Sequence, residues 1–349
     1  MKVVIIAPMS DEEIDAVRAV DPRLEVDYAW QLFAPELVAD WPTHTVDWYL
    51  PRAFRQAVDT APDRDRRDAL LAEAEVVCVT FPFPTHLVSR APRLRFVQQL
   101  PAGVSNLVRG DLWQTHVPVA SGRGAGNTLA IAEWAIAAAL TLSKEFPRAL
   151  RQASTGHLER APFRGRGVAG KTLGVVGLGG IGSQVARLGA ALRMHVVGSR
   201  WSPEPVDHVS RIFAPSQPND LLAVSDVVVL CTQLTHETHH LIDRGALAAM
   251  RPGAFLINVA RGELIDEAAL LEALHSGHLG GFAADVYEGE FEHQPPAELL
   301  ARDDVILTPH TSGQTEHPSR GAVEVFQENV RRCLDGQPLL NLVDWQRGY

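Results

Sequence analysis

Residues 172–201 read "TLGVVGLGGIGSQVARLGAALRMHVVGSRW", and this stretch decides the fold. Its beginning, "TLGVV", is a continuous apolar run, which is typical of a strand covered on both faces. The glycines of "GLGGIG" at 177–182 predict a tight turn, and "GSQVARLGAALR" predicts a helix directly after it. "MHVVGS" at 194–199 predicts a second strand. The stretch is therefore expected to be one strand–turn–helix–strand unit of a parallel sheet.

The glycine turn matches the pattern GxGxxG with Gly177, Gly179 and Gly182. Alone the pattern is weak, and a turn without a ligand is the alternative interpretation. Because it follows a predicted strand and opens a predicted helix, it indicates a dinucleotide site, in which the pyrophosphate meets the N–H groups at the helix start. Gly180 and Ile181, which lie between these glycines, are expected to bind the same group.

The end of the second strand indicates which dinucleotide is bound. Such a site usually carries an acid there, which accepts hydrogen bonds from the ribose hydroxyls. This chain has Ser199 and Arg200 instead. A guanidinium pairs with a 2′-phosphate, and a serine hydroxyl can donate to it. We therefore expect NADP(H) to be favoured over NAD(H). The alternative is that Arg200 stacks on the adenine or points to solvent, which would leave weak discrimination.

The composition is that of a soluble globular protein with a hydrophobic fraction of 46%. Its 349 residues suit two domains that each bury a core. A net charge of −10 argues against a nucleic-acid-binding surface, which needs clustered Lys and Arg. The longest apolar segment, at 128–142, is shorter than a membrane span and carries Glu133. No nucleic-acid or membrane partner is expected.

The cysteines and the N-terminus indicate the compartment. Cys78, Cys231 and Cys333 are widely separated and show no CxxC spacing, so we interpret them as small core residues in a reducing compartment. "MKVVIIAP" is too short an apolar run for a signal peptide and is followed at once by the acidic "SDEEID". We expect a cytoplasmic protein.

Two series of apolar segments alternate with polar helices. The first holds the expected strands "KVVIIAP", "AEVVCVTF" and "LRFVQQL", and Ser10 with Glu13 forms a capping-box signature for the helix "DEEIDAVRAV". The second series starts at Lys171. Its six expected strands are "TLGVVGL", "MHVVGS", "DVVVLCT", "AFLINVA", "GGFAADV" and "DVILTPH". The alternation predicts the α/β class with right-handed crossovers.

We therefore predict two doubly wound parallel-sheet domains. A helix from about Thr128 to Lys144 and an irregular segment at 154–170 precede the second series. Residues 121–313 are expected to form a Rossmann dinucleotide-binding domain. Residues 1–120 plus 314–349 form the other domain, because the helix "SRGAVEVFQENVRRCLDG" is expected to return to it once the second sheet has its six strands.

Three later segments carry groups suited to redox chemistry on a carbonyl. "INVARGELIDEAAL" (257–270) places Arg261 after a strand, "GGFAADVYEGE" (280–290) contains Asp285 and Glu290, and "VILTPHTSG" (305–313) contains His310. In an open parallel sheet, ligands bind outside the carboxyl ends of the strands. All three segments are thus expected to gather at the edge that holds the glycine turn.

The sequence resembles the D-isomer-specific 2-hydroxyacid dehydrogenases over nearly its whole length. "GKTLGVVGLGGIG", "NVARGELIDEAAL" and "LTPHTSG" look like the three signatures of that family, in order and at its spacing. The resemblance implies a flavodoxin-like substrate domain beside the Rossmann domain, an active site in the cleft between them, and hinge closure that excludes water. It also implies a homodimer joined through the cofactor domain and the helix at 128–144.

The resemblance further implies residue roles. Arg261 would bind the substrate's carboxylate and carbonyl oxygen, His310 would be the acid/base, and Glu290 would be its carboxylate partner. Glu290 is chosen over Glu288 and Glu292 because its spacing from Arg261 matches the family. The loop "PAGVSN" would bind the substrate carboxylate through Ala102, Gly103 and Val104. The other cofactor-binding positions that we expect are Thr232, Gln233, Val259, Asp285 and Gly313.

These residue types suit the reduction of a 2-keto acid. Charge builds on the carbonyl oxygen as hydride reaches the carbon, and a protonated His310 can donate to that oxygen, an effect of roughly 10²–10⁴ in rate. Glu290 would favour the imidazolium, and Arg261 offers a planar fork that fits a 2-keto acid. The expected activity is NAD(P)H-dependent reduction of glyoxylate or hydroxypyruvate to the D-2-hydroxy acid.

Two alternatives remain at this stage. The chain could be a non-enzymatic NAD(P)-sensing protein like the corepressors that share this scaffold, although it retains every catalytic residue type.

Gln233 stands where the family often has proline, which weakens the assignment of Thr232 and Gln233 as cofactor-binding residues. The histidines of "THETHH" (235–240) could suggest a metal site, but no cysteine is near them and hydride transfer needs no metal. We expect no metal and interpret them as a solvated helix start.

Overall fold

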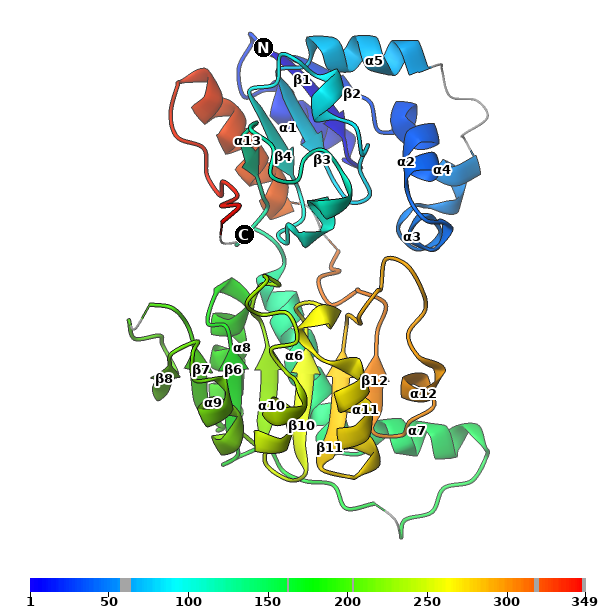
Figure 1. Ribbon diagram of the computed structural model, residues 1–349, viewed down its shortest axis with the longest axis vertical. Helices are drawn as coiled ribbons and strands as arrows, with labels where there is room; N and C mark the ends of the chain where they lie inside the picture. The colour runs from blue at the N-terminus through cyan, green and yellow to red at the C-terminus, as the bar shows by residue number, and fades with distance from the viewer. Residues whose placement is uncertain (57–63, 162, 203, 317–319, 347–349) are drawn as a thin grey trace. The chain divides into compact units, whose positions relative to one another are not determined.

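The computed structural model describes residues 1–56, 64–161, 163–202, 204–316 and 320–346. The chain divides into two compact units, which are considered separately (Figure 1). Unit 1 comprises Met1–Gly126 and Glu316–Tyr349, and unit 2 comprises Asn127–Thr315. Both units are parallel α/β sheets, so the predicted fold class is confirmed.

Unit 1 contains, in its described residues, a five-stranded parallel sheet of order β2-β1-β3-β4-β5. Its strands are β1 (Lys2–Ile6), β2 (Glu25–Tyr28), β3 (Val76–Val79), β4 (Phe96–Gln99) and β5 (Val119–Ala120). Its helices are α1 (Asp11–Arg18), α2 (Ala34–Asp40), α3 (Thr43–Tyr49), α4 (Arg52–Gln56), α5 (Arg64–Glu73) and α13 (Arg320–Leu334), with 3₁₀ turns η1 (Gln31–Phe33), η3 (Val88–Arg90) and η4 (Ser105–Arg109).

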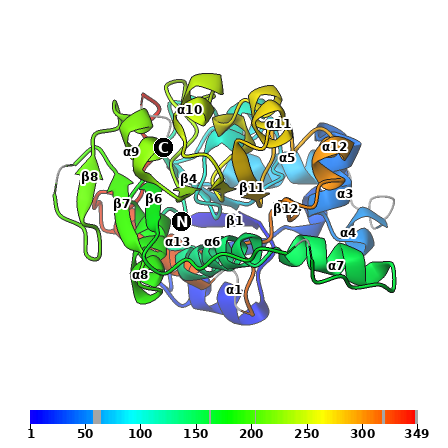
Figure 2. The same cartoon turned by 90° about the horizontal axis from the view of Figure 1, so that it is seen from below.

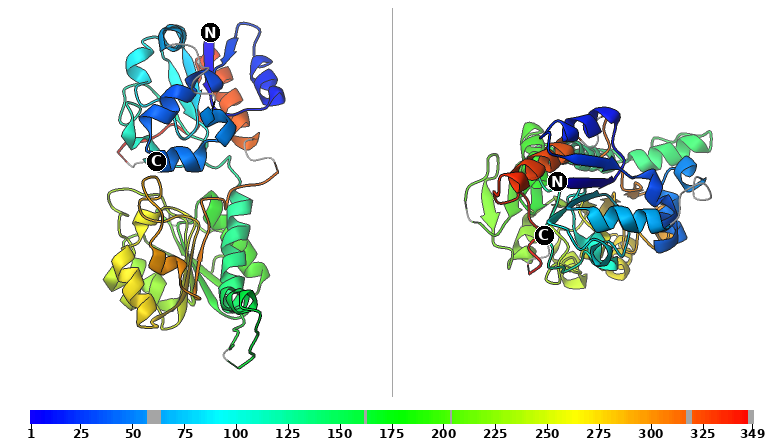
Figure 3. Two further views of the ribbon diagram at one scale, coloured as in Figure 1. Left: turned by 90° about the vertical axis from the view of Figure 1, so that its right-hand side faces the viewer. Right: turned by 90° about the horizontal axis from the view of Figure 1, so that it is seen from above.

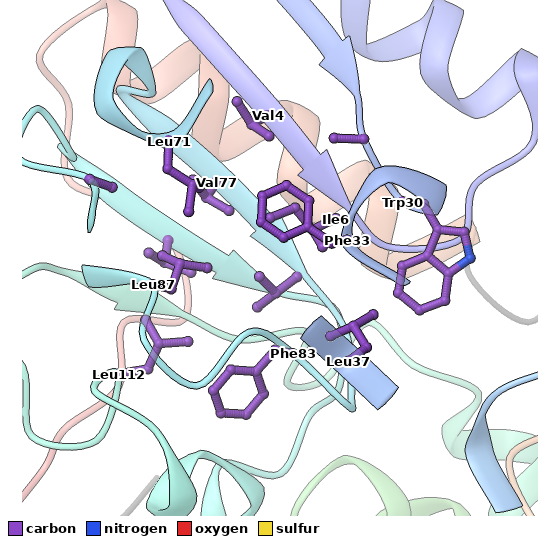
Figure 4. Packing of buried hydrophobic residues seen from close by; sticks show 14 of the residues in the cluster. Val4, Ile6, Trp30, Phe33, Leu37, Leu71, Val77, Phe83, Leu87 and Leu112 are labelled. Carbon is purple, nitrogen blue, oxygen red and sulfur yellow. The ribbon is translucent and has the colours of Figure 1, made fainter. Parts of the chain in front are cut away.

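Strand β1 shows why this sheet is covered on both faces. Val4 and Ile6 belong to one core cluster, whereas Val3 and Ile5 belong to another, because successive side chains of a strand point to opposite faces. Figure 4 shows the first cluster, in which Phe33 lies beside the β1 side chains. These four side chains of β1 are all 0% exposed. The continuous apolar run therefore identified a strand with two buried faces.

The C-terminal helix α13 covers the second face of this sheet. Val323, Phe326 and Val330 pack with Val3 and Ile5 in one cluster. Figure 3 shows α13 beside α1, and the two helices are in contact. Full burial of a phenylalanine such as Phe326 stabilises the fold by roughly 1.5–3 kcal/mol.

Helix α1 begins with the predicted capping box. The Glu13 N–H donates to Ser10 Oγ over 3.2 Å, and the Ser10 N–H donates to Glu13 Oε2 over 2.8 Å. Two backbone donors at the helix start are thereby satisfied.

Unit 2 contains, among the residues described, a seven-stranded parallel sheet of order β12-β11-β10-β9-β6-β7-β8. Its strands are β6 (Thr172–Val176), β7 (His195–Ser199), β8 (Arg211–Phe213), β9 (Val227–Leu230), β10 (Ala254–Asn258), β11 (Leu279–Ala284) and β12 (Val305–Leu307). Its helices are α6 (Thr128–Ser143), α7 (Phe146–Ser154), α8 (Gly180–Ala191), α9 (Pro218–Val224), α10 (Arg244–Ala249), α11 (Glu267–His275) and α12 (Ala297–Leu300), with the 3₁₀ turn η5 (Gly262–Leu264).

The prediction of six strands in the second sheet was wrong by one. The missed strand, β8, is only three residues long and pairs with β7 at the edge of the sheet, so it carries too little periodicity to identify. With it, the order read from β8 is 3-2-1-4-5-6-7, which extends the Rossmann order by one strand. The switch point of that order lies between β6 and β9.

The two faces of the unit 2 sheet have separate helix layers. Figure 2 shows α6 and α8 on one face and α9, α10 and α11 on the other. Ala132, Ala135 and Ala139 of α6 are buried in the first layer, where small side chains let α6 approach α8 and the sheet. Within the described residues, no helix is long and apolar enough to cross a membrane.

Helix α7 was not predicted. It follows α6 directly and ends where the expected irregular segment begins. Phe146 is 53% exposed and Leu150 is 70% exposed on it. Phe146, Ala149, Leu150 and Ala153 have the i, i+3, i+4, i+7 spacing of an amphipathic helix, so the sequence carried a helical signal here that was overlooked.

The cysteine side chains are all thiols. Burial raises the pKa of Cys78 well above its ordinary value and raises the pKa of Cys231 to about 12. Burial also raises the pKa of the half-buried Cys333, with Arg95 opposing that effect.

Candidate active site

The predicted site residues of unit 2 follow the carboxyl ends of its strands. Because all strand pairs of this sheet are parallel, those ends lie along one edge. Gly177 follows β6, Arg200 follows β7, Arg261 follows β10, and His310 lies beyond β12. Thr232 and Gln233 follow β9, Val259 follows β10, Asp285 follows β11, and Gly313 lies after His310. The structure therefore brings the glycine turn and the redox segments to the same edge.

The glycine turn has the geometry of a phosphate cradle. Gly177 has a φ of +98°, and a Cβ there would lie 2.8 Å from the carbonyl oxygen of Cys231 after β9. A Cβ on Gly182 would lie 2.0 Å from the carbonyl oxygen of Gly177, so helix and turn pack in backbone contact. The N–H groups of Gly177 and Leu178 donate to the Ser199 carbonyl over 3.2 and 2.9 Å. The two close backbone approaches require glycine at positions 177 and 182.

Gly179 differs from the other two glycines. A Cβ on it would meet nothing within 4 Å, so the chain leaves open space at this point. Helix α8 starts at Gly180, and no side chain caps its N-terminus. Open space beside uncapped N–H groups at a positive dipole end suits a pyrophosphate. Gly179, Gly180 and Ile181 are therefore the residues that fit the phosphates of a dinucleotide.

The backbone of Arg200 is held by strand β8, which was not predicted from the sequence. The Arg200 N–H donates to the Phe213 carbonyl of β8 over 3.4 Å, and the Arg200 side chain is half-buried. Ser199 is only 7% exposed, and its carbonyl receives the glycine-turn N–H groups. The guanidinium thus stands at the end of β7, where an acid would hold a ribose.

His310 and Glu290 form the predicted pair. His310 Nδ1 lies 3.0 Å from Glu290 Oε1, and the Glu290 side chain is 1% exposed. The His310 side chain is 31% exposed, so the imidazole has one buried and one accessible side. A carboxylate at Nδ1 fixes the tautomer and orientation of the ring, which makes Nε2 the nitrogen that can exchange a proton.

The backbone of His310 is in the left-handed region, with a φ of 53°. A non-glycine residue in this region costs about 1–3 kcal/mol, so it persists only where the surrounding structure compensates for that cost. The His310 N–H donates to the Asp285 carbonyl over 2.9 Å. The Asp285 carboxylate accepts from the N–H of Thr311 over 2.8 Å, from the N–H of Ser312 over 2.7 Å and from the Thr308 hydroxyl. These bonds hold the loop that presents His310.

Asp285 is therefore an anchor of the 308–312 loop. It was expected along the cofactor, but its side chain is 1% exposed and both carboxylate oxygens accept hydrogen bonds from this loop.

Arg261 is held by a residue that sequence reasoning missed. Asn258, the last residue of β10, is 0% exposed and donates from Nδ2 to the Arg261 carbonyl over 2.7 Å. Asn258 Oδ1 accepts the Ala260 N–H over 3.0 Å. The Arg261 guanidinium donates to the Ala260 carbonyl over 2.7 Å. A fully buried amide at the end of an apolar strand was the available signal, since buried polar groups need partners.

The remaining positions that were expected to bind the cofactor lie in ordered loops. The Gln233 carbonyl accepts from Thr238 Oγ1 over 2.7 Å, so the segment after β9 is tied back on itself. Val259 is 8% exposed and its N–H donates to Leu230 of β9. The Gly313 carbonyl accepts from Asn127 Nδ2 over 2.6 Å.

A second acid, Glu263, lies close to the pair. Burial raises its pKa, its own N–H and the N–H of Gly289 lower it by hydrogen bonding, and the charge of Glu290 raises it while that of Arg261 lowers it. Sequence reasoning did not single out this residue.

In unit 1, the loop expected to bind the substrate carboxylate follows β4. Gln99 Nε2 donates to the Gly103 carbonyl over 2.7 Å, which fixes the loop. Ala102 is exposed, whereas Val104 is 2% exposed and packs in the core.

The His239 and His240 rings are tilted by 33° to one another, with centroids 4.1 Å apart. In the described part of the chain, no group of three or more His, Cys, Asp or Glu side chains is arranged to hold a metal ion.

Comparison with known proteins shows what this chain is similar to. The family model described as D-isomer specific 2-hydroxyacid dehydrogenase, NAD binding domain, matches residues 136–312. A D-3-phosphoglycerate dehydrogenase of Archaeoglobus fulgidus is 31% identical over 346 residues, which cover 99% of this chain and 59% of that protein. A glyoxylate/hydroxypyruvate reductase of Arabidopsis thaliana is 29% identical over 312 residues, 85% of this chain and 93% of that protein.

A solved structure is similar over the whole chain. It is a D-isomer specific 2-hydroxyacid dehydrogenase from Xanthobacter autotrophicus Py2 in complex with NADPH and MES. The TM-score is 0.75 at 28% identity, and the match covers 100% of this chain and 99% of that one. The chain spans only 49–59% of the length of two archaeal D-3-phosphoglycerate dehydrogenases that it matches.

Proposed function

Since the chain belongs to the D-isomer specific 2-hydroxyacid dehydrogenase family, we propose that it reduces a small 2-keto acid to the D-2-hydroxy acid with a nicotinamide cofactor. The observation that carries this proposal is the pair of His310 and buried Glu290, 3.0 Å apart, at the same sheet edge as the glycine turn. A protein that only senses the nucleotide has no need of this pair.

Each site residue has a separate proposed role in the reaction. When bound, the nicotinamide supplies the hydride to the carbonyl carbon. The guanidinium of Arg261 binds the carboxylate and carbonyl oxygen as a planar fork. Protonated His310 donates from Nε2 to the oxygen as charge develops on it. Glu290 keeps the imidazolium favourable and the ring oriented. For the second contact to the substrate carboxylate, our proposal is the backbone N–H groups of Ala102, Gly103 and Val104.

The proposed cofactor is NADPH. Arg200 ends β7, where an acid would select NADH, and a guanidinium can pair with a 2′-phosphate. The proposed substrates are glyoxylate and hydroxypyruvate. A phosphorylated substrate needs cationic partners, and the loop "PAGVSN" at 101–106 carries neither Lys nor Arg. The similarity to a glyoxylate/hydroxypyruvate reductase over most of its length supports this choice.

The function is tested by following the absorbance of NADPH and NADH with a panel of keto acids. The panel contains glyoxylate, hydroxypyruvate, pyruvate and phosphohydroxypyruvate. We expect turnover with the first two and a D-configured product from hydroxypyruvate. Cofactor binding without turnover on any keto acid would overturn the proposal in favour of a sensor.

We further propose a homodimer that buries α6 and α7 against a second copy. Leu129 of α6 is 43% exposed, Phe146 and Leu150 of α7 are 53% and 70% exposed, and Leu158 after α7 is 68% exposed, so these two helices and the segment after them present large apolar side chains to solvent. Light scattering after size exclusion tests this. A wild-type dimer that Leu150→Glu converts to a monomer supports the proposal, and a wild-type monomer refutes it.

A further inference from the structure

The chain passes between its two units twice, and the side chain of Asn127 joins the two crossings. Unit 2 begins at Asn127 and ends at Thr315. Asn127 Nδ2 donates to the Gly313 carbonyl over 2.6 Å and to Thr315 Oγ1 over 3.2 Å. The first and last residues of unit 2 are thus joined by a hydrogen bond, although 188 positions separate them along the chain.

Asn127 does not use its side chain to cap the helix that it precedes. It is the N-cap residue of α6, where an asparagine side chain ordinarily accepts an N–H of the first turn. In the part of the chain that the structure describes, its side chain makes no such capping bond, although its carbonyl accepts the Ile131 N–H over 3.0 Å. The side-chain amide is directed instead at residues 313–315.

Gly313 lies against the first turn of α6. Its carbonyl accepts the bond from Asn127, and a Cβ added to it would lie 3.6 Å from two carbon atoms of Ile131. Asn127 and Ile131 are four residues apart, so they lie on one side of the helix start. A hydrogen bond and a packing contact therefore hold Gly313 on the same side of α6.

Through Gly313, the bond of Asn127 reaches the segment that presents His310. Gly313 directly follows the 308–312 loop, whose last two N–H groups donate to the Asp285 carboxylate over 2.8 and 2.7 Å. Asp285 thus holds this loop from within, and Asn127 holds it where it ends. The two anchors act on different parts of the same loop.

The first crossing is also fixed within unit 1, by an amide of the same kind. Asn341 Nδ2 donates to the Arg123 carbonyl over 2.7 Å. A Cβ on Gly321 would lie 2.0 Å from the Ala125 carbonyl oxygen, so the start of α13 is in backbone contact with this segment. Asn341 therefore offers a matched comparison for Asn127, because it binds the same segment from the unit 1 side.

We propose that Asn127 is a positioning residue of the active site, which fixes the end of the 308–312 loop to the start of α6 and so keeps the His310 imidazole in place. Without this bond, movement at the boundary of the two units would be transmitted along residues 313–315 to the histidine. The proposal rests on the proposed function for its kinetic consequences. Its structural consequence, the ordering of the loop, does not require turnover.

The test compares Asn127→Asp and Asn127→Ala with the matched control Asn341→Asp in the full-length protein. The aspartate has nearly the size of asparagine, but it replaces the donor with an oxygen that faces the Gly313 carbonyl. The alanine removes the donor without adding a charge. Asn341→Asp makes the same exchange of donor for oxygen at the Arg123 carbonyl.

Two measurements without turnover report on the loop. Amide hydrogen exchange of residues 308–313 should become about three- to tenfold faster in both Asn127 variants, because the loop loses the anchor at its end. The NMR signals of the His310 ring C–H groups, assigned through His310→Gln, should move in the same two variants. Asn341→Asp should leave both measurements within error of the wild type.

In the keto-acid reaction, a misplaced proton donor should lower kcat rather than raise KM. We expect kcat to fall about 10- to 100-fold in Asn127→Asp and less in Asn127→Ala. The KM for the keto acid and the Kd for NADPH should stay within about threefold of the wild type, because Arg261 and the glycine turn make the proposed substrate and phosphate contacts. Asn341→Asp should keep the kcat of the wild type.

Unchanged hydrogen exchange and unchanged His310 signals in Asn127→Asp overturn the proposal even if activity is lost, because Asn127 would then act by another route. Equal changes in Asn341→Asp overturn it as well, and so does a loop that exchanges faster while kcat is unchanged. If the wild-type protein reduces no keto acid while the loop changes occur in the Asn127 variants alone, the proposed function fails and the anchoring by Asn127 stands.

Discussion

Asp285 holds His310 from two directions. Its carbonyl accepts the His310 N–H over 2.9 Å, and its buried carboxylate accepts the N–H groups of Thr311 and Ser312 at 2.8 and 2.7 Å. A residue expected beside the cofactor is thus the anchor of the loop that presents the imidazole. The left-handed backbone of His310 is a local conformation that these long-range bonds enforce.

Replacement of Asp285 should therefore misplace the imidazole. We expect Asp285→Ala to lower kcat at least about tenfold and to destabilise the protein by about 2–4 kcal/mol, because buried N–H groups lose a charged acceptor. Steady-state kinetics and urea unfolding measure the two effects. Asp285→Asn, which keeps one acceptor oxygen, should be less destabilised. A fully active Asp285→Ala protein would contradict the anchoring role.

The paired imidazole and carboxylate should have separable effects. His310→Ala should lower kcat by roughly 10²–10⁴ and leave the Kd for NADPH within about twofold. In Glu290→Gln the imidazolium loses its counter-charge, which disfavours the protonated ring. Because reduction needs protonated His310, the high-pH limb of kcat/KM should then move to lower pH. Loss of cofactor binding in His310→Ala would instead indicate a structural histidine.

Arg200 should set the cofactor preference. We expect Arg200→Asp to lower the ratio of kcat/KM for NADPH to that for NADH by about 10- to 100-fold, since a charge-assisted bond worth about 1.5–3 kcal/mol is replaced by repulsion. Arg211→Gln is the matched control, because its guanidinium stacks over Phe213 of β8 at 4.2 Å. An unchanged ratio in Arg200→Asp would remove the inference of an NADP(H) preference.

Two glycines of the same turn should respond differently to an added methyl group. Gly179→Ala should fold normally, because the Cβ enters open space, but should bind NADPH at least about tenfold more weakly if the pyrophosphate fills that space. Gly182→Ala should lower the melting temperature, because its Cβ would lie 2.0 Å from the Gly177 carbonyl oxygen. Thermal unfolding and cofactor fluorescence separate these outcomes. Unimpaired NADPH binding by Gly179→Ala would place the phosphates elsewhere.

The sequence was sufficient for the features that depend on local pattern. Apolar runs marked the longer strands, and parallel pairing then placed Gly177, Arg261 and His310 at one edge. It was not sufficient for β8, because three residues at an edge give no usable period. Helix α7 was overlooked although Phe146, Ala149, Leu150 and Ala153 have helical spacing.

Within the site, the sequence did not reveal the roles of residues whose hydrogen-bond partners are distant along the chain. The pairing of His310 with Glu290 could be expected from a family spacing. The roles of Asn258 and Asp285 depend on hydrogen bonds to loops that only the folded chain brings near. Residue type alone does not reveal such partners.

The high pKa values of the three thiols have a practical use. Maleimides react with thiolates, so the native cysteines should label slowly near neutral pH, and Cys333→Ser removes the one with the most access. Cysteines introduced at Val108 in unit 1 and Leu300 in unit 2, which are 60% and 53% exposed, would then carry a donor and an acceptor dye. Energy transfer between the dyes would measure the separation of the two units with and without nucleotide.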